Sequence, residues 1–199
     1  MQCCRDFNGN PNALLAVLLA RTARQYDSES EKTVSVSVAI NHKAMLGVYD
    51  NYRLFAGVIE LDFPKDKPLD DITKACTIAR RQIKLQATPE NSLRALKERK
   101  NNYAKMDQMP LDMKLKAMAK AAGNARWSFT VSYMNTRTMG LLDSYIEALY
   151  VLTEPIVADI CCEMTCMNHN FFLAVAQSSS ASRFINTFLR CHAPFENGR

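Results

Sequence analysis

Residues 34–41, VSVSVAIN, and residues 55–63, FAGVIELDF, decide the fold. In the first segment, branched apolar residues fill every second position and alternate with serine or alanine, which predicts a strand with one apolar face. The second segment is an apolar run that ends before Pro64, and proline cannot donate to a sheet ladder. We therefore expect two core strands joined by a long loop over residues 42–54, with the second strand stopping at Pro64 or lying at an edge.

The segment before these strands predicts a buried helix. Residues 13–26, ALLAVLLARTARQY, are apolar nearly all round until two arginines appear near the end. Asn10 or Asn12 would cap this helix, and Pro11 suits its first turn because proline has no N–H to leave unpaired.

Three further helices are expected after the strand pair. The first has Asp70 and Asp71 in its first turn, where carboxylates interact favourably with the helix dipole. Thr88 and Pro89 mark the start of the second, and Pro110 ends it. The third covers residues 111–122 and stops at a Gly-Asn pair.

The last third of the chain predicts three strands and one helix. Residues 127–134, WSFTVSYM, alternate between large and small polar side chains, as in a half-buried strand. Residues 159–167 and 171–177 are two β-rich runs around a short polar turn, which indicates a hairpin. A final helix is expected over residues 181–191, and residues 193–199 are expected to be a frayed tail.

Taken together, the elements predict an α+β fold. Their order is helix, two strands, three helices, three strands and a helix, so strand runs and helix runs are partly segregated. This order favours a two-layer sandwich, a mixed β-sheet with helices packed on one face, in a single domain over residues 1–199. A chain of this length can bury most of its surface without a metal or a disulfide.

Composition limits the classes of function. The net charge is +5, and residues 80–120 hold eleven Lys and Arg against four Asp and Glu. Such a stretch is either a solvated helix face or a surface for an anionic partner, and we expect no nucleic acid among its partners. The seven cysteines have no regular ligand spacing, so free thiols in a reducing cytoplasm are expected and a metal site is not.

The beginning of the sequence lacks the apolar core of a signal peptide, and no run approaches the 18 apolar residues of a membrane span. We therefore expect a cytoplasmic protein with no membrane span.

The stretch at residues 34–63 resembles the C-terminal half of the chloramphenicol acetyltransferase-like superfamily, especially condensation domains and alcohol acetyltransferase-like proteins. In these families an apolar helix leads to a strand ending in Asn-x-Arg, and a loop and a Gly-Asn-Phe-x-Gly-type segment follow. Here the matching residues are Asn41-His42-Lys43 and Phe55-Ala56-Gly57, with Lys43 in place of Arg and Arg53-Leu54 in place of Gly-Asn. The resemblance implies the half-fold of that superfamily.

A second site candidate lies at the end of the 127–134 strand. Ser132 and Tyr133 resemble the Ser-Asn or Ser-Tyr that often ends a later strand of the family. On its residues alone, Ser132 is interpreted as a core-facing hydroxyl bonded to backbone, because no histidine and acid lie nearby in sequence to activate it. The resemblance instead makes Asn41, His42, Lys43, Ser132 and Tyr133 candidates for the substrate tunnel or the lobe interface.

The family transfers acyl groups with a histidine that acts as general base, set in a His-x-x-x-Asp motif. Neither His42, His169 nor His192 is followed by Asp at that spacing. The resemblance therefore implies the C-terminal lobe of an acyltransferase, inactive alone, whose partner is a missing N-terminal catalytic lobe. In the family the Arg that Lys43 replaces pairs with the Asp of that motif.

The resemblance also implies the substrates and partners. No cofactor would be bound covalently, and coenzyme A or a phosphopantetheine thioester would be the acyl donor, delivered as acyl-CoA or on an acyl carrier protein. The face that a partner lobe would cover predicts self-association of the lobe alone. Two alternatives stay open, a non-catalytic binding or docking module of the same fold and an unrelated small enzyme.

Overall fold

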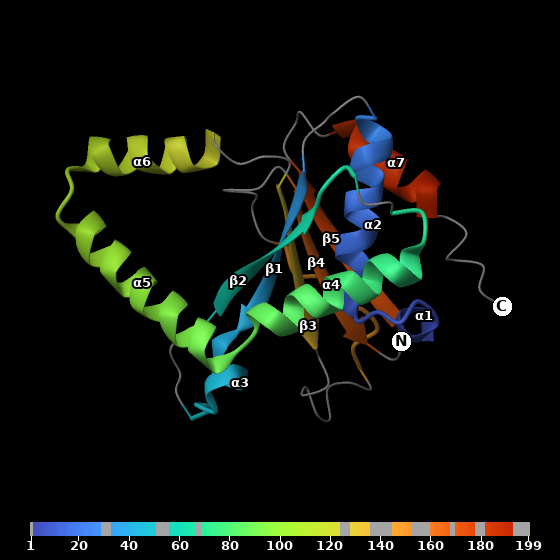
Figure 1. The fold of residues 1–199 in the computed structure, drawn as a ribbon, viewed down its shortest axis with the longest axis horizontal. Helices are drawn as coiled ribbons and strands as arrows, with labels where there is room; N and C mark the ends of the chain where they lie inside the picture. Colours follow the sequence, from blue (N-terminus) through green and yellow to red (C-terminus); the bar gives the residue numbers. More distant parts are fainter. Residues whose placement is uncertain are drawn as a thin grey trace.

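The computed structural model describes residues 2–28, 33–50, 56–66, 69–123, 128–135, 145–152, 160–167, 170–177 and 182–192. Figure 1 shows a twisted sheet with helices in front of it and two helices that extend to one side. The elements are α1 (Gln2–Asp6), α2 (Pro11–Tyr26), β1 (Val34–Asn41), α3 (His42–Leu46), β2 (Ala56–Phe63), α4 (Ile72–Gln86), α5 (Pro89–Asp107), α6 (Leu111–Gly123), β3 (Ser128–Asn135), β4 (Ile160–Met167), β5 (Asn170–Gln177) and α7 (Ser182–His192).

The five strands form one mixed sheet in the order β2-β1-β3-β4-β5. Both outer pairs, β1 with β2 and β4 with β5, are antiparallel, whereas β1–β3 and β3–β4 are parallel. The expected strands, the hairpin of β4 and β5, and the edge position of β2 are therefore confirmed. The carboxyl ends of the three parallel strands meet at the same end of the sheet.

One face of the sheet carries the core. Val36 of β1 pairs with Leu61 of β2 and with Phe129 of β3, and all three side chains are fully buried. Helices α2, α4 and α7 cover this face, with α2 in contact with β1, β3 and both other helices. Of the two residues expected to cap α2, Asn10 is the cap, and its side chain accepts from the N–H of Ala13 at 2.8 Å. The predicted two-layer α+β architecture is confirmed.

The opposite face of the sheet is lined by small and polar side chains. Ser35 and Ser37 on β1 donate to the carboxylates of Asp62 and Glu60 on β2, at 2.8 and 2.6 Å. Further across the same face, Glu163 of β4 is buried. Among the described residues, no helix packs on this side. Residues 145–152 cover it over β4 and β5, where Thr165 donates to the carbonyl of Leu149 and Tyr150 packs edge to face on Phe172. We call the part of this face over β1, β2 and β3 the open face.

The free edge of β2 is closed by two glutamines from α4. Gln86 accepts from the N–H of Glu60 at 3.4 Å and donates to its carbonyl at 2.7 Å. Gln82 forms the same pair of bonds with Asp62, at 3.2 and 3.3 Å. Each side-chain amide thus satisfies one N–H and one C=O that an edge strand would otherwise expose.

Two short helices were not predicted. Residues 42–46, expected within a loop, form α3, and residues 2–6 form α1. Helices of five residues are too short to show a periodic apolar pattern. The expectation that Asp70 and Asp71 lie in the first turn of the next helix is wrong, because α4 begins at Ile72. Asp71 is its N-cap and accepts from the N–H of Lys74 at 3.0 Å.

Parts of further expectations lie outside the described residues. These are Arg53, Leu54 and Phe55 of the resemblance, Trp127, the turn of the hairpin and the tail over residues 193–199.

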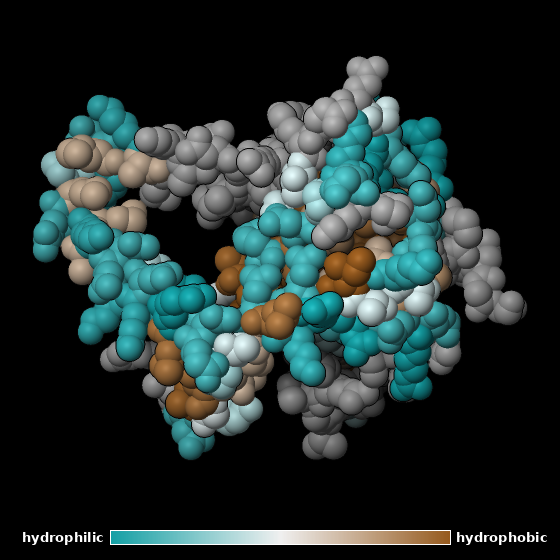
Figure 2. Space-filling model, viewed as in Figure 1, coloured by the Kyte–Doolittle hydropathy of each residue, from teal (hydrophilic) through white to brown (hydrophobic). Residues whose placement is uncertain are grey.

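Helices α5 and α6 form an arm that stands away from the sheet (Figure 1). Ser92 is the one side chain of α5 that is fully buried. Leu111 and Leu115 of α6 are 71% and 57% exposed. Figure 2 shows hydrophilic side chains along most of α5, with hydrophobic ones where α5 meets α3. The arm is therefore attached to the body at its α3 end.

Candidate functional site

The Asn41-His42-Lys43 segment turns the end of β1 into α3. Asn41 is the N-cap, and its side-chain oxygen accepts from the N–H of Lys43 at 3.0 Å. Gly47 ends the helix in the left-handed conformation, φ 67°, which glycine adopts without strain. Within the described structure Asn41 therefore has a local role, to set the direction in which His42 leaves the strand.

His42 is packed directly against β2. Its side chain is 2% exposed, and a Cβ built on Gly57 would lie no more than 3.0 Å from three atoms of the imidazole. The missing side chain of Gly57 is what leaves space for the ring, because any larger residue would overlap it. This contact explains why a glycine is needed one residue into β2.

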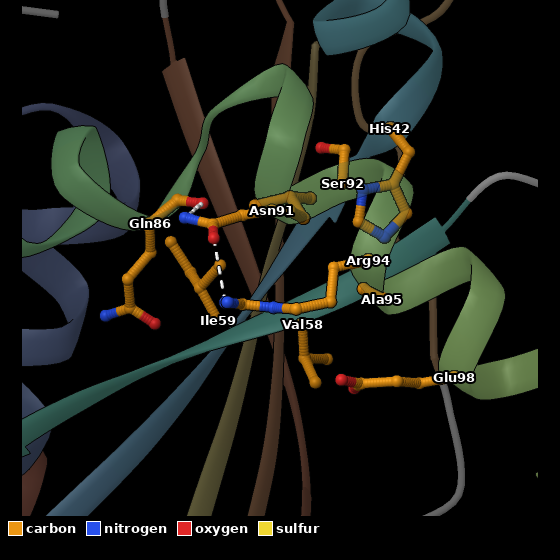
Figure 3. A pocket seen from close by; sticks show the side chains of 10 residues that line it. His42, Val58, Ile59, Gln86, Asn91, Ser92, Arg94, Ala95 and Glu98 are labelled. Atoms are coloured by element: carbon orange, nitrogen blue, oxygen red, sulfur yellow. Dashed lines mark hydrogen bonds between the residues drawn. The ribbon is translucent and has the colours of Figure 1, made fainter.

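A pocket of about 150 Å³ opens beside the His42 ring. Figure 3 shows the imidazole reaching from α3 into this space next to Ser92. Arg94 and Glu98, one turn apart on α5, lie nearer the exposed side of the pocket. The lining residues are Ile40, His42, Val58, Ile59, Gln86, Asn91, Ser92, Arg94, Ala95 and Glu98.

The inner end of the pocket contains buried polar atoms without protein partners. Neither ring nitrogen of His42 nor the hydroxyl of Ser92 makes a hydrogen bond, and Ser92 is 1% exposed. Burial lowers the pKa of His42 below its usual value, and the positive charge of Arg99 lowers it further. The imidazole is therefore neutral at pH 7, with one nitrogen as donor and the other as acceptor.

The polar residues at the exposed side of the pocket are partly engaged. Asn91 donates to the carbonyl of Gln86 at 3.0 Å and accepts from a guanidinium N–H of Arg94 at 2.8 Å. The Arg94 guanidinium and the Glu98 carboxylate carry opposite charges and line the same opening. This arrangement suits the binding of a molecule with no net charge.

Chemically, the site offers a neutral histidine without an orienting acid. Glu98 lines the same pocket, yet no hydrogen bond joins it to His42. A general base needs a reachable proton and a suitable pKa, and a carboxylate partner normally fixes its tautomer. The geometry therefore favours binding over proton transfer at His42.

The structure places Ser132 and Tyr133 on opposite faces of β3. Tyr133 packs against the core, edge to face with Phe171 at a ring-centroid distance of 6.1 Å. Since Phe129 and Val131 face the core, alternation points Ser132 to the open face, where it is half-buried. The interpretation of Ser132 as a core-facing hydroxyl is therefore wrong.

The five expected site residues share one end of the sheet without forming one cluster. Because β1 and β3 are parallel neighbours, Asn41 and Ser132 both lie toward the carboxyl ends of their strands. His42 lies in the pocket against α5, whereas Ser132 lies on the open face of the sheet. Lys43 is half-buried in the first turn of α3.

Sequence reasoning missed Ser92, Arg94 and Glu98. All three lie in a helix that was correctly expected, but its charged residues were attributed to a solvated or donor-binding face. The one available signal was Ser92, a small polar residue one turn after the helix start. That position gives no indication of which strand the helix will meet.

Four of the described cysteines, Cys4, Cys76, Cys161 and Cys162, are buried. Burial raises the pKa of Cys162 to about 12, with Cys161 and Glu163 adding to the effect, so this thiol stays protonated at neutral pH. Among the residues whose side chains the structure describes, six cysteines form no disulfide, and no group of three His, Cys, Asp or Glu residues could hold a metal ion. Every helix in those ranges is too short or too polar to cross a bilayer.

No protein-family model matches the sequence, and no curated protein matches it. Three solved structures are similar in fold. The PapA2 acyl transferase aligns at a TM-score of 0.56 and 10% identity, covering 98% of this chain and 41% of that protein. The condensation domain of the Monacolin K polyketide synthase MokA aligns at a TM-score of 0.54 and 13% identity, covering 96% of this chain and 41% of that protein. The epimerization domain from the third module of tyrocidine synthetase B aligns at a TM-score of 0.50 and 10% identity, covering 96% of this chain and 42% of that protein.

Identities of 10–13% show the fold and nothing finer. The chain spans about two fifths of the length of these three proteins. This likeness covers nearly the whole chain, with the mixed sheet and its helices included. The chain thus has the half-fold of condensation and acyltransferase domains, as the resemblance in its sequence predicted.

Proposed function

We propose that this chain is the C-terminal lobe of a condensation-type acyltransferase that uses a thioester of coenzyme A or of carrier-protein phosphopantetheine. The observation that carries the proposal is the likeness in fold to PapA2 and to the MokA condensation domain, over 96–98% of this chain. The lobe would form one wall of the substrate tunnel. The open face is the surface that we assign to this role, and on β1 it carries the small side chains Ser35 and Ser37, which donate to Asp62 and Glu60.

In this proposal the general base comes from a partner catalytic lobe. The sequence has no His-x-x-x-Asp motif, and His42 has no hydrogen-bonded acid. Lys43 would face the motif of that lobe, as the resemblance implies. A lysine keeps the positive charge but lacks the two-pronged geometry that arginine offers a carboxylate.

Positive charge on α4, α5 and α6 supports binding of an anionic donor. Arg80 is already used within the body, where it donates to the backbone and side-chain oxygens of Asn8 at 2.9 and 2.8 Å. Lys97 and Lys100 on α5 are exposed. Coenzyme A phosphates or an acidic carrier protein would meet these exposed cations, and such contacts weaken as salt rises.

The test is release of free thiol from acetyl-CoA with a panel of alcohols and amines. We expect background rates for the chain and for His42→Ala, since general-base catalysis typically contributes about 10²–10⁴-fold and the base is absent. Adding a separately expressed catalytic lobe that carries the motif should restore turnover. Lys43→Ala should then lower turnover more than it lowers stability.

Two outcomes would contradict the proposal. Turnover by the chain alone that disappears in His42→Ala would make this a complete enzyme. Salt-dependent binding of coenzyme A or a carrier protein, with no turnover in any combination, would favour the alternative of a non-catalytic docking module.

A further inference from the structure

The strongest unassigned feature is the inner end of the His42 pocket. Two polar side chains from different elements, His42 of α3 and Ser92 of α5, are both at least nine-tenths buried and lack hydrogen-bond partners. Buried polar groups are normally satisfied, because leaving one unpaired costs free energy. Both groups line the same cavity, so one occupant could satisfy both.

The size of the pocket limits the occupant to a small molecule. The volume of about 150 Å³ is similar to that of an engineered apolar cavity known to accept benzene. Apolar side chains of Ile40, Ile59 and Ala95 form part of the walls. A molecule with about six or seven heavy atoms that has both an apolar part and a polar group fits this description.

The charges in the pocket favour a neutral ligand. His42 is neutral, and the charge of Arg94 at the lining is opposed by that of Glu98, while Arg99, whose charge reaches His42, does not line the pocket. The neutral imidazole has one acceptor nitrogen, and the Ser92 hydroxyl can donate. A hydroxyl group, which accepts and donates at once, satisfies this pair, whereas a methyl group satisfies neither member.

We propose that this pocket is a binding site for a small neutral hydroxyl compound of about the size of phenol, whose hydroxyl contacts His42 and Ser92. The apolar part of the ligand lies against Ile59 and Ala95, and the Arg94 and Glu98 side points to solvent. The site does not depend on the proposed acyl-transfer role, and no covalent step is involved.

The test compares phenol with toluene, which replaces the hydroxyl by a methyl group of similar size. Ligand-observed NMR titration of the full chain should show phenol binding about tenfold more tightly than toluene, the ratio expected for a hydrogen bond to buried groups. Ser92→Ala should reduce this ratio severalfold, and Ser132→Ala, on the open face, should leave it unchanged. Saturating phenol should also shift the imidazole resonances of His42 and leave those of His192 in place.

The wild-type comparison requires no variant to fold, so it decides the question alone. Equal affinity for phenol and toluene would overturn the proposal, as would the absence of binding at millimolar phenol, which would leave ordered water as the occupant. An unchanged ratio in Ser92→Ala would remove Ser92 from the site.

Discussion

The sheet body and the junction between α3 and α5 are built in different ways. In the body, apolar side chains fill the space between the sheet and α2, and Gln82 and Gln86 pair the free edge of β2. At the junction, both ring nitrogens of His42 and the Ser92 hydroxyl are buried without partners in one pocket, and the arm that begins there is largely exposed. In the body, the atoms of this kind are scattered, one each on Asn12, Gln177 and His192. Native structures rarely leave such groups unsatisfied, and a bound water, ion or ligand, or a functional role, is the usual reason. The body therefore provides stability, and the junction is where we propose a site.

A core truncation tests the body most strongly. Phe129 is fully buried on β3 and packs against Phe184 of α7 at a ring-centroid distance of 5.1 Å. We expect Phe129→Ala to lower the free energy of unfolding by about 3–5 kcal/mol, because it removes a buried aromatic ring and leaves a cavity. Urea denaturation followed by circular dichroism measures the change.

The matched control is Leu115→Ser on the exposed arm, expected to change stability by less than about 0.5 kcal/mol. A comparable loss from both substitutions would mean that the arm belongs to the cooperative core.

The next largest effect is expected at the junction. In Gly57→Ala the new methyl group would overlap the His42 ring, which must move out of its buried position. We expect a loss of about 1–3 kcal/mol, the usual cost of overpacking, together with loss of phenol binding in the same NMR titration.

Gly9→Ala serves as the control, since a Cβ there meets its neighbours at ordinary contact distances of 3.5 Å. Unaltered His42 resonances in Gly57→Ala would contradict the packing described here.

Removal of the edge glutamines tests how the body controls association. Each glutamine forms two hydrogen bonds with the β2 backbone, and we expect Gln82→Ala and Gln86→Ala each to cost about 0.5–1.5 kcal/mol. The double variant exposes an unpaired edge, so its weight-average mass in light scattering should rise with concentration more steeply than that of the wild-type chain. The control is Arg81→Ala, at an exposed position of α4. A monomeric double variant would show that the glutamines do not protect the edge.

The smallest effect concerns pH. Burial lowers the pKa of His42 and of His192, which contacts the Thr22 hydroxyl at 3.0 Å. The unfolded chain, with histidine pKa near 6.5, therefore takes up protons before the folded chain does. Stability should be greatest above about pH 6.5 and fall as the pH drops below it.

The dependence of the free energy of unfolding on pH should be weaker in His42→Gln and in His192→Gln than in wild type. Urea denaturation between pH 7.5 and about 5 measures it. A slope unaltered in both variants would assign the pH dependence to other groups.

The sequence determined the body of this protein. Alternation in VSVSVAIN, the apolar helix before it and the cap at Asn10 depend on neighbouring residues and the periods of strand and helix, so they can be read locally. The order of these elements was also enough to indicate the half-fold that the solved structures share.

Only the tertiary structure decided the site. The pocket joins His42, Ile59 and Ser92, which belong to three elements, and its form depends on how α5 lies against β2. Likewise, Gln82 and Gln86 resemble any solvated glutamines until α4 is placed along the free edge of the sheet. Local patterns indicate which face of an element is apolar. Contacts between elements distant in sequence arise from packing and cannot be predicted from any single segment.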